Sequence, residues 1–350
     1  LKVLLRGAKL LILDEPTAVL TPQETDELFE QLLLLKKNDH TIIFISHKIR
    51  EVMQICDNIT VLRAGRTVGS IPVANATEED ISRFMVGRDV ILKMNKKPAE
   101  FGDTLLKVTD LTYENKEGRK LLDHVSFSLK KGQILGIAGV EGNGQNELAE
   151  AIFGFYSGVK GSILFDGKEI LGKSIRAIRN DGISYIPEDR IKTGAAGNIS
   201  LWGNMIADII DSPLLKKHGL LNYKNIHERA DKLISDFGVL CQNDDQPIGM
   251  LSGGNMQKVV VAREFSSDPK LLIANQPTRG IDVGANEFIW KKIIEQRDAG
   301  KGVILISADL NEIMELSDSI LVMCGGQAAA RVSGLGRVDH GDDVVADLHG

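Results

Sequence analysis

The sequence has 350 residues, of which 43% are hydrophobic and 26% are charged, and its formal net charge is −6. Such values are typical of a globular chain with room for about one to three domains, and they argue against broad electrostatic binding to nucleic acid or anionic lipid. No apolar run reaches the roughly 18–20 residues that span a bilayer, so we expect any role at a membrane to depend on a partner. The cysteines are scattered, without a CxxC spacing, which favours reduced thiols over a disulfide or a metal site.

Residues 1–94 have the pattern of an α/β unit. Leu10–Leu13 and Thr41–Ser46 are short, continuously apolar runs, as expected for parallel strands that are buried on both faces. Between them, Thr21 and Glu24 form a capping box that predicts the start of a helix. A strand–helix–strand unit of this kind belongs to a doubly wound, mostly parallel sheet. Because leucine is not a natural first residue and the pattern opens in the middle of a domain, we expect the chain to be part of a longer polypeptide.

A second domain is expected over residues 104–327. Residues 95–103 are polar and contain proline and glycine, which indicates a linker. The segment 108–129 alternates in polarity like an antiparallel sheet, and residues 199–240 have a mostly helical pattern. The remaining segment is rich in glycine, aspartate and alanine and has little periodicity, so we expect residues 328–350 to form a loosely ordered tail.

One segment occurs twice in the chain. Residues Leu10–Gly65 recur without a gap at Leu271–Gly326, and each residue stands 261 positions after its counterpart. A repeat of this length points to two copies of one domain. The apolar scaffold persists, but Asn275, Gln276 and Ala308 stand where the first copy has Asp14, Glu15 and His47. The pattern favours one catalytically competent nucleotide site and one site that binds nucleotide or supports the structure without catalysis.

The first copy carries a pair of carboxylates at the end of an apolar strand. Chemistry on ATP needs one carboxylate to hold Mg²⁺ and another to orient the attacking water, both beside a phosphate loop. Asp14 suits the metal and Glu15 suits the water, while His47 ends the next strand and could contact the γ-phosphate or the water. The alternative is structural, because the pair could simply start a loop and His47 could cap a helix.

The sequence GVEGNGQN forms a glycine loop between an expected strand and an expected helix. Its glycines, Gly139, Gly142 and Gly144, have the spacing of a P-loop, GxxxxGK[ST], whose backbone amides form an anion nest at a helix N-terminus. Gln145 and Asn146 replace the lysine and the hydroxyl residue, so we expect the loop shape without the ammonium on the phosphates. A glycine turn without a ligand is the alternative.

The sequence LSGGN places Ser252, Gly253 and Gly254 at the start of an amphipathic helix. The glycines let another molecule's phosphate approach the backbone, and Ser252 can add a hydroxyl donor. Alone this pattern would be a common helix cap. Here it stands about twenty residues before the apolar strand of the second copy, which makes it a specific signal.

The order of glycine loop, LSGGN, apolar strand and switch position resembles an ATP-binding cassette (ABC) ATPase, and the likeness extends to about Gly326. It implies an α/β P-loop NTPase fold with an antiparallel β subdomain and a helical subdomain, in tandem. AVLTPQE in the first copy, with IPEDR and PTRGIDVGA in the second domain, is similar to the two-cassette ATPases of simple-sugar and nucleoside importers. GVEGNGQ together with the carboxylate-free ANQPTRG is most similar to the nucleoside branch.

The resemblance implies roles by position. Asp14 would be the Walker B aspartate that binds Mg²⁺, Glu15 the catalytic glutamate and His47 the switch histidine of the first cassette. The signature of the second cassette would be Ser252, Gly253 and Gly254. Glu188 departs from the family pattern because it stands at the usual Q-loop glutamine. Tyr113 would stack on adenine, although a tyrosine buried in the sheet is the alternative.

Cassettes of this family pair head to tail, so each ATP lies between the P-loop of one cassette and the signature of the other. The resemblance therefore implies a competent site built from the first cassette's carboxylates, the second cassette's signature and a P-loop expected upstream of Leu1. The other site would have the Gln145 loop and no base. ATP and Mg²⁺ are the implied cofactors. The implied partners are transmembrane permease subunits at the cytoplasmic face of the membrane and, through them, a substrate-binding protein or lipoprotein; nucleic acid is not expected.

Two other functions stay open from the sequence. A tandem-cassette protein could act on ribosomes or nucleic acid, although such proteins generally keep both sites catalytic and carry a long charged linker. A regulatory pseudo-ATPase is the second alternative, because the glycine loop at Gly139–Asn146 has no P-loop lysine. We expect the chain on its own to be inactive as an ATPase for the same reason.

Overall fold

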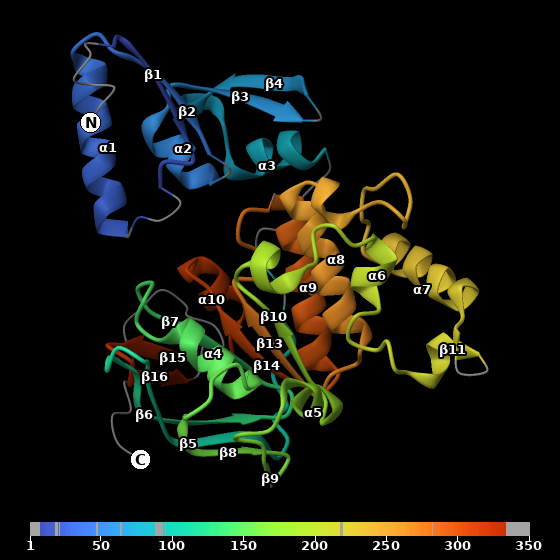
Figure 1. Cartoon of the computed structure of the whole chain (residues 1–350). Helices are drawn as coiled ribbons and strands as arrows, with labels where there is room; N and C mark the ends of the chain where they lie inside the picture. Colours follow the sequence, from blue (N-terminus) through green and yellow to red (C-terminus); the bar gives the residue numbers. More distant parts are fainter. Residues whose placement is uncertain are drawn as a thin grey trace. The chain divides into compact units, whose positions relative to one another are not determined.

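A computed structural model gives the fold of the chain (Figure 1). It describes residues 8–17, 20, 22–46, 48–63, 65–87, 94, 96–217, 220–281 and 283–333. The chain divides into two compact units, one comprising Leu1–Leu92 with Asp282–Glu287 and the other comprising Lys93–Ile281 with Phe288–Gly350. The expected helix cap Thr21 and the expected switch residue His47 lie outside the described residues.

The first unit contains a strand–helix–strand motif followed by a hairpin and a helix. Strands β1 (Leu10–Asp14) and β2 (Thr41–Ile45) pair in parallel, and α1 (Pro22–Lys37) connects them. The next elements are α2 (Ile49–Ile55), the antiparallel strands β3 (Asn58–Arg63) and β4 (Arg66–Pro72), a short turn η2 (Val73–Asn75) and α3 (Glu78–Val86). Helix α3 begins with a complete capping box, in which Thr77 and Asp80 satisfy each other's backbone N–H groups.

The strands of the first unit are not buried on both faces, so that prediction was wrong here. Phe29 of α1 packs edge-on against Phe44 of β2, with ring centroids 5.9 Å apart, which covers one face. Side chains alternate between faces along a strand, and on the other face Ile12 is 63% exposed and Ile43 is 46% exposed. An apolar run predicts a strand, but burial of both faces also needs layers on each side, and the described residues of this unit supply a layer on one.

Among its described residues, the second unit contains two large sheets and a small two-stranded one. The first is antiparallel, with strand order β6-β5-β8-β9. Its strands are β5 (Thr104–Glu114), β6 (Lys120–Lys130), β8 (Lys160–Phe165) and β9 (Lys168–Glu169). The second has the order β10-β13-β14-β7-β15-β16, and all neighbours are parallel except β15 and β16. Its strands are β7 (Ile134–Ala138), β10 (Ile183–Ile186), β13 (Leu271–Asn275), β14 (Gly302–Ile306), β15 (Ser319–Cys324) and β16 (Gln327–Ser333).

Helix α4 (Gln145–Phe153) contacts β6 of one sheet and β13 of the other (Figure 1). Leu148, Ile152 and Phe153 of this helix lie in the largest apolar core, together with side chains from both sheets. Helices α5 (Ile175–Asn180), α9 (Val283–Asp298) and α10 (Leu310–Leu316) follow strands in the chain order expected for a doubly wound fold. The continuously apolar strands β7, β13 and β14 are buried at all five of their positions.

The helical part of this unit consists of α6 (Leu201–Met205), α7 (Tyr223–Asp236) and α8 (Gly253–Ser266), which contact one another (Figure 1). The short turns η4 (Pro213–Leu215) and η5 (Ile248–Met250) lie between these helices, and η3 (Arg190–Gly194) precedes α6. The predicted mostly helical pattern of residues 199–240 is interrupted by a small hairpin, β11 (Lys216–Lys217) and β12 (Leu220–Leu221).

The prediction of a loosely ordered tail was wrong for residues 328–333, which belong to a strand. Residues 327–333 form β16, which pairs antiparallel with β15 from Ser319↔Ser333 to Cys324↔Gln327. The segment AAARV has no strong apolar pattern. It still forms β16, because this strand lies at the edge of the sheet and backbone hydrogen bonds to one neighbour hold it. Residues 334–350 lie outside the described residues, and the expected linker at 95–103 stays a prediction.

Candidate nucleotide-binding site

The glycine loop connects the fully buried strand β7 to the N-terminus of α4. At two of its positions, nearby backbone atoms leave no room for a side chain. A Cβ on Gly144, whose φ is +101°, would lie 2.8 Å from the carbonyl oxygen of Leu121, and one on Gly139 would lie 2.5 Å from that of Met323. The loop therefore keeps the compact P-loop shape that the spacing predicts, with backbone N–H groups at the start of a helix where an anion binds favourably.

Gln145, which stands in place of the P-loop lysine, is folded back onto its own loop. Its side-chain Nε2 donates to the carbonyl oxygen of Val140 at 3.1 Å, and its Oε1 accepts from the backbone N–H of Asn143 at 3.1 Å. The side chain is buried. Gln145 therefore braces the loop, and one of the loop's N–H groups is already satisfied before any phosphate binds.

A cavity of about 190 Å³ opens beside this loop. The loop and helix contribute Gly139, Gly142, Gln145 and Asn146, while the opposite wall contains the three residues that replaced charged groups, Asn275, Gln276 and Ala308. The structure thus brings together, within one unit, residues that the sequence placed in different motifs. Such a cavity at the carboxyl ends of parallel strands is the usual ligand position in open α/β sheets.

Asn275 and Asn146 bind each other where the resemblance implies a metal. Asn275 Nδ2 donates to Asn146 Oδ1 at 2.6 Å and lies 3.4 Å from the hydroxyl oxygen of Tyr185. Mg²⁺ prefers oxygen ligands that include a carboxylate and sit in a near-octahedral arrangement. Two neutral amides joined by a hydrogen bond do not supply this donor set, so the second copy does not fit Mg²⁺.

The first copy offers the opposite chemistry at the matching positions. Asp14 ends β1 with an exposed side chain, and Glu15 follows it. Glu15 has φ +46° and donates its backbone N–H to Ile45 at 2.9 Å, while Gln276 has φ +51° and donates to Ile306 at 2.8 Å. Both copies therefore hold this side chain on the same left-handed turn, and only the functional group has changed.

Gln276 also makes a contact that links it to the switch position. Its Oε1 accepts from the backbone N–H of Ala308 at 3.1 Å. The amide can accept this bond as a carboxylate would, but it cannot accept a proton from water in the way a base does. The turn after β13 and the end of β14 are thus held together without a catalytic base.

Sequence reasoning missed a charged group at the cavity. Arg279, within the PTRGID motif, forms an ion pair with Glu188 and lies 3.8 Å from Glu141 of the glycine loop. Burial raises the pKa of the Glu188 carboxyl, and Arg279 counteracts this. Glu188, at the expected Q-loop position, is therefore paired with Arg279 of the same unit. A motif search for glutamine could not reveal this ion pair.

The signature residues lie apart from this cavity. Ser252 caps α8, and its Oγ accepts from Asn255 Nδ2 at 3.0 Å. A Cβ on Gly253 would lie 2.6 Å from the guanidinium of Arg190, so the glycine leaves room for that side chain. Neither Ser252 nor Gly253–Gly254 lines the cavity beside the glycine loop.

Tyr113 stacks on Tyr156, with ring centroids 4.4 Å apart and planes 17° apart. It packs against the main apolar core and does not line the cavity. Its role in adenine stacking therefore stays a prediction, and the alternative of a sheet tyrosine describes its contacts.

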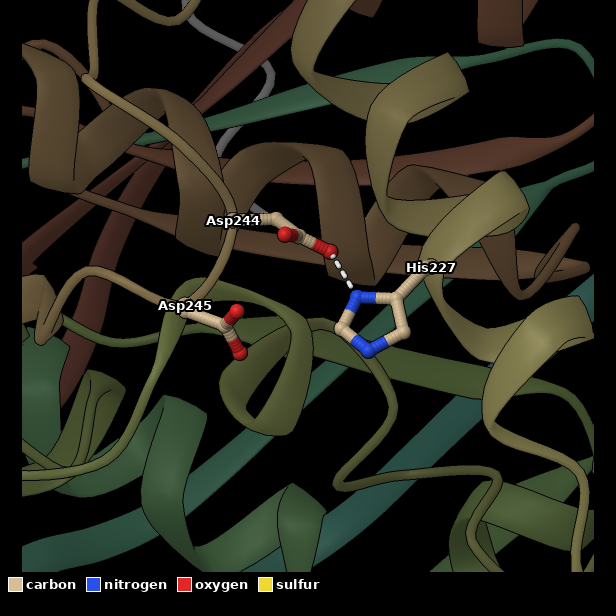
Figure 2. A group of neighbouring side chains, drawn as sticks. All are labelled: His227, Asp244 and Asp245. Carbon is tan, nitrogen blue, oxygen red and sulfur yellow. Dashed lines mark hydrogen bonds and ion pairs between the residues drawn. The ribbon is translucent and has the colours of Figure 1, made fainter.

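A separate cluster of titratable groups lies in the helical part (Figure 2). Among the described residues, it is the group of His, Cys, Asp or Glu whose ligand atoms lie within 4.8 Å of one another: His227, Asp244 and Asp245. His227 Nδ1 donates to Asp244 at 2.5 Å, which raises the pKa of the histidine, and Trp202 Nε1 donates to Asp245 at 2.9 Å. Both carboxylates are thus used as acceptors that tether α7 and α6 to the loop before η5.

In the part of the chain that the structure describes, no helix has the length and apolar character needed to cross a membrane.

The strand–glycine loop–helix geometry, with its cavity at the ends of parallel strands, defines a P-loop nucleotide-binding fold. Comparison with known proteins narrows this class. The ABC transporter family model matches residues 122–279. The glucose import ATP-binding protein of Haloferax volcanii is 42% identical over 329 residues, covering 93% of this chain and 60% of that protein. The guanosine import ATP-binding protein of Bacillus subtilis is 42% identical over 333 residues, covering 95% and 65%.

The nucleoside import ATP-binding protein of Lactococcus lactis is 39% identical, covering 95% of this chain and 66% of that protein. A solved nucleotide-free ATP-binding cassette from an ABC transporter is 26% identical, with a TM-score of 0.56, and covers 66% of this chain and 92% of that one. The chain belongs to the family of ABC transporter ATP-binding proteins. It spans slightly less than two thirds of the length of these import proteins.

Proposed function

We propose that this chain is part of the subunit that binds and hydrolyses ATP to energise an ABC importer for nucleosides or simple sugars. One composite site, with Asp14, Glu15 and His47 of the first cassette and the signature Ser252–Gly254 of the second, is competent. The other, at the Gln145 loop, is degenerate. With this function, the subunit lies at the cytoplasmic face of the membrane. It contacts permease subunits, which receive substrate from a substrate-binding protein or lipoprotein.

The observation that carries the asymmetry is the shared backbone of Glu15 and Gln276. Both stand on a left-handed turn with the same backbone hydrogen bond to the neighbouring strand, so the second copy has kept the frame and lost the base. The Asn275–Asn146 hydrogen bond supports the same assignment, because it occupies the metal position with neutral amides. A site built in this way can hold a nucleotide but has no group to activate water.

In the competent site, the chain's own residues would divide the work. Asp14, exposed at the carboxyl end of β1, fits Mg²⁺ through its carboxylate oxygens. Mg²⁺, when bound, would neutralise charge on the phosphates. Glu15 would orient the attacking water and accept its proton. The backbone amides that follow Ser252 would donate to the charge that develops on the γ-phosphate.

The test of the asymmetric assignment uses the full-length subunit assembled with its permease. Glu15→Gln should reduce ATP turnover by about 10²–10⁴-fold and spare ATP binding, because it removes a positioned base. Gln276→Ala, at the matching position of the second copy, removes no base and should cost less than about tenfold. Turnover would be measured by phosphate release and binding by a fluorescent ATP analogue. Equal losses in the two variants would contradict the assignment.

The nucleoside preference rests on GVEGNGQ and on the carboxylate-free ANQPTRG. The names of the compared relatives divide between a sugar and nucleosides at 39–42% identity. Uptake of labelled guanosine and of labelled glucose by vesicles that carry the complete transporter separates the two substrate classes.

A further inference from the structure

In each unit, a glutamate binds the turn that follows the expected base position. In the second unit, Glu312 of α10 is fully buried, and its Oε1 accepts from Thr278 Oγ1 at 2.9 Å and from Trp290 Nε1 at 2.7 Å. Thr278 stands two residues after Gln276, and Glu312 stands four residues after Ala308. The contact therefore ties the turn after β13 to the helix that follows the switch position.

The first unit contains the same contact at the matching positions, 261 residues earlier. Thr17, which is 1% exposed, donates its hydroxyl to Glu51 Oε2 at 2.6 Å. Thr17 stands two residues after Glu15, and Glu51 lies in α2, four residues after His47. Since each unit makes this bond independently, it belongs to the fold of the repeated domain.

The charge beside the glutamate differs between the copies. In the first unit, Lys48 Nζ lies 2.9 Å from Glu51 Oε1 and 3.4 Å from the carbonyl oxygen of Thr17, so an ammonium joins both ends of the contact. The matching residue of the second unit is Asp309. Burial, with a further contribution from the charge of Asp309, raises the pKa of Glu312 to about 7. The countercharge has been lost in the same copy that lost the catalytic groups.

We propose that Thr17 and Glu51, with Lys48 as the countercharge, form a clamp that positions Glu15 for hydrolysis of ATP. Thr17 and Glu51 are positioning residues, because they act through the turn that carries Glu15. The clamp rests on the proposed function for the role of Glu15. Loss of the Thr17 hydroxyl would remove one donor from the Glu51 carboxylate and let the turn move, and small displacements of a reacting group are costly.

The experiment again uses the full-length subunit with its permease. Thr17→Val should lower kcat for ATP hydrolysis by about 10- to 100-fold, with KM for ATP changed less than about twofold. Thr17→Ser, which keeps the hydroxyl, should restore kcat. Glu51→Leu, which removes the acceptor of the Thr17 hydroxyl, should behave like Thr17→Val, and the matched change Thr278→Val in the second copy should leave kcat within about twofold.

The outcomes separate the clamp from the function on which it rests. If Glu15→Gln abolishes turnover while Thr17→Val and Glu51→Leu retain it, the clamp is wrong and the proposed function stands. If Glu15→Gln retains turnover, the proposed function itself is wrong. Equal losses of kcat in Thr17→Val and Thr278→Val, or no rescue by Thr17→Ser, would assign the contact to folding alone and overturn the proposal. Circular dichroism of each purified variant checks that the chain is folded.

Discussion

Glu312 is a buried carboxyl whose pKa, about 7, lies well above its ordinary value of 4.5 because burial disfavours the charged form. The folded chain therefore binds this proton more tightly than the unfolded chain between these two pH values. A proton bound more tightly in the folded state makes the free energy of unfolding fall as the pH rises through the window, by up to about 3 kcal/mol for this group.

We expect Glu312→Gln to remove this pH dependence. The original chain should unfold at a lower temperature at pH 8 than at pH 5 as far as this group contributes, and the variant should show a smaller difference. Thermal unfolding followed by circular dichroism measures it. Glu295→Gln, which changes an exposed carboxyl paired with Lys292, is the control and should keep the original dependence. An unchanged pH dependence in Glu312→Gln would contradict the effect of burial.

At the scale of residues, sequence reasoning identified positions better than contacts. The repeat and the P-loop spacing led to Asn275, Gln276, Gln145 and Asn146, which line one cavity. The hydrogen bond between Asn275 and Asn146 joins side chains 129 residues apart and depends on their rotamers. Such a contact has no local sequence signal, and the same holds for the engagement of Glu188 by Arg279.

At the scale of elements, the same apolar pattern gave two outcomes. β13 and β14 are buried at every position, whereas the matching strands β1 and β2 expose Ile12 and Ile43. The pattern specifies a strand that can be covered on both faces, while the layers that cover it come from other segments. Edge strand β16 escaped prediction for a related reason, since small residues suffice where one neighbour supplies the hydrogen bonds.

Helix α8 provides a prediction about the signature. Ser252 is exposed at its N-cap, so a larger side chain can be accommodated in the isolated unit at a cost of about 1 kcal/mol for the lost cap. In the assembled transporter, Ser252→Arg should fill the phosphate approach and stop both ATP hydrolysis and uptake. Ser252→Thr, which keeps the hydroxyl cap, should retain them. Normal uptake by a folded Ser252→Arg complex would mean that the signature does not complete a shared site.

At the scale of the whole molecule, the repeat explains how one chain can carry two different sites. The two copies share the left-handed turn after the first strand and the threonine–glutamate hydrogen bond from that turn to the helix after the next strand. At the expected nucleotide-facing positions, Asp14, Glu15 and His47 of the first copy are matched by Asn275, Gln276 and Ala308 of the second. The difference between the two copies could be predicted from the sequence because the copies align without a gap. Each residue of one copy can therefore be compared with its counterpart in the other.

The distribution of parts between the copies leads to a prediction for the 350-residue chain alone, which should show negligible ATPase activity. Within this sequence, the glycine loop at Gly139–Asn146 belongs to the copy that has Gln276 in place of a base, and the loop has Gln145 in place of lysine. The carboxylates Asp14 and Glu15 belong to the other copy, for which the sequence contains no glycine loop of this spacing. Phosphate release by the purified chain should therefore equal that of its Glu15→Gln variant. Release above that control, at saturating ATP and Mg²⁺, would show that the Gln145 loop supports hydrolysis without the missing groups and would refute the division of labour between the copies.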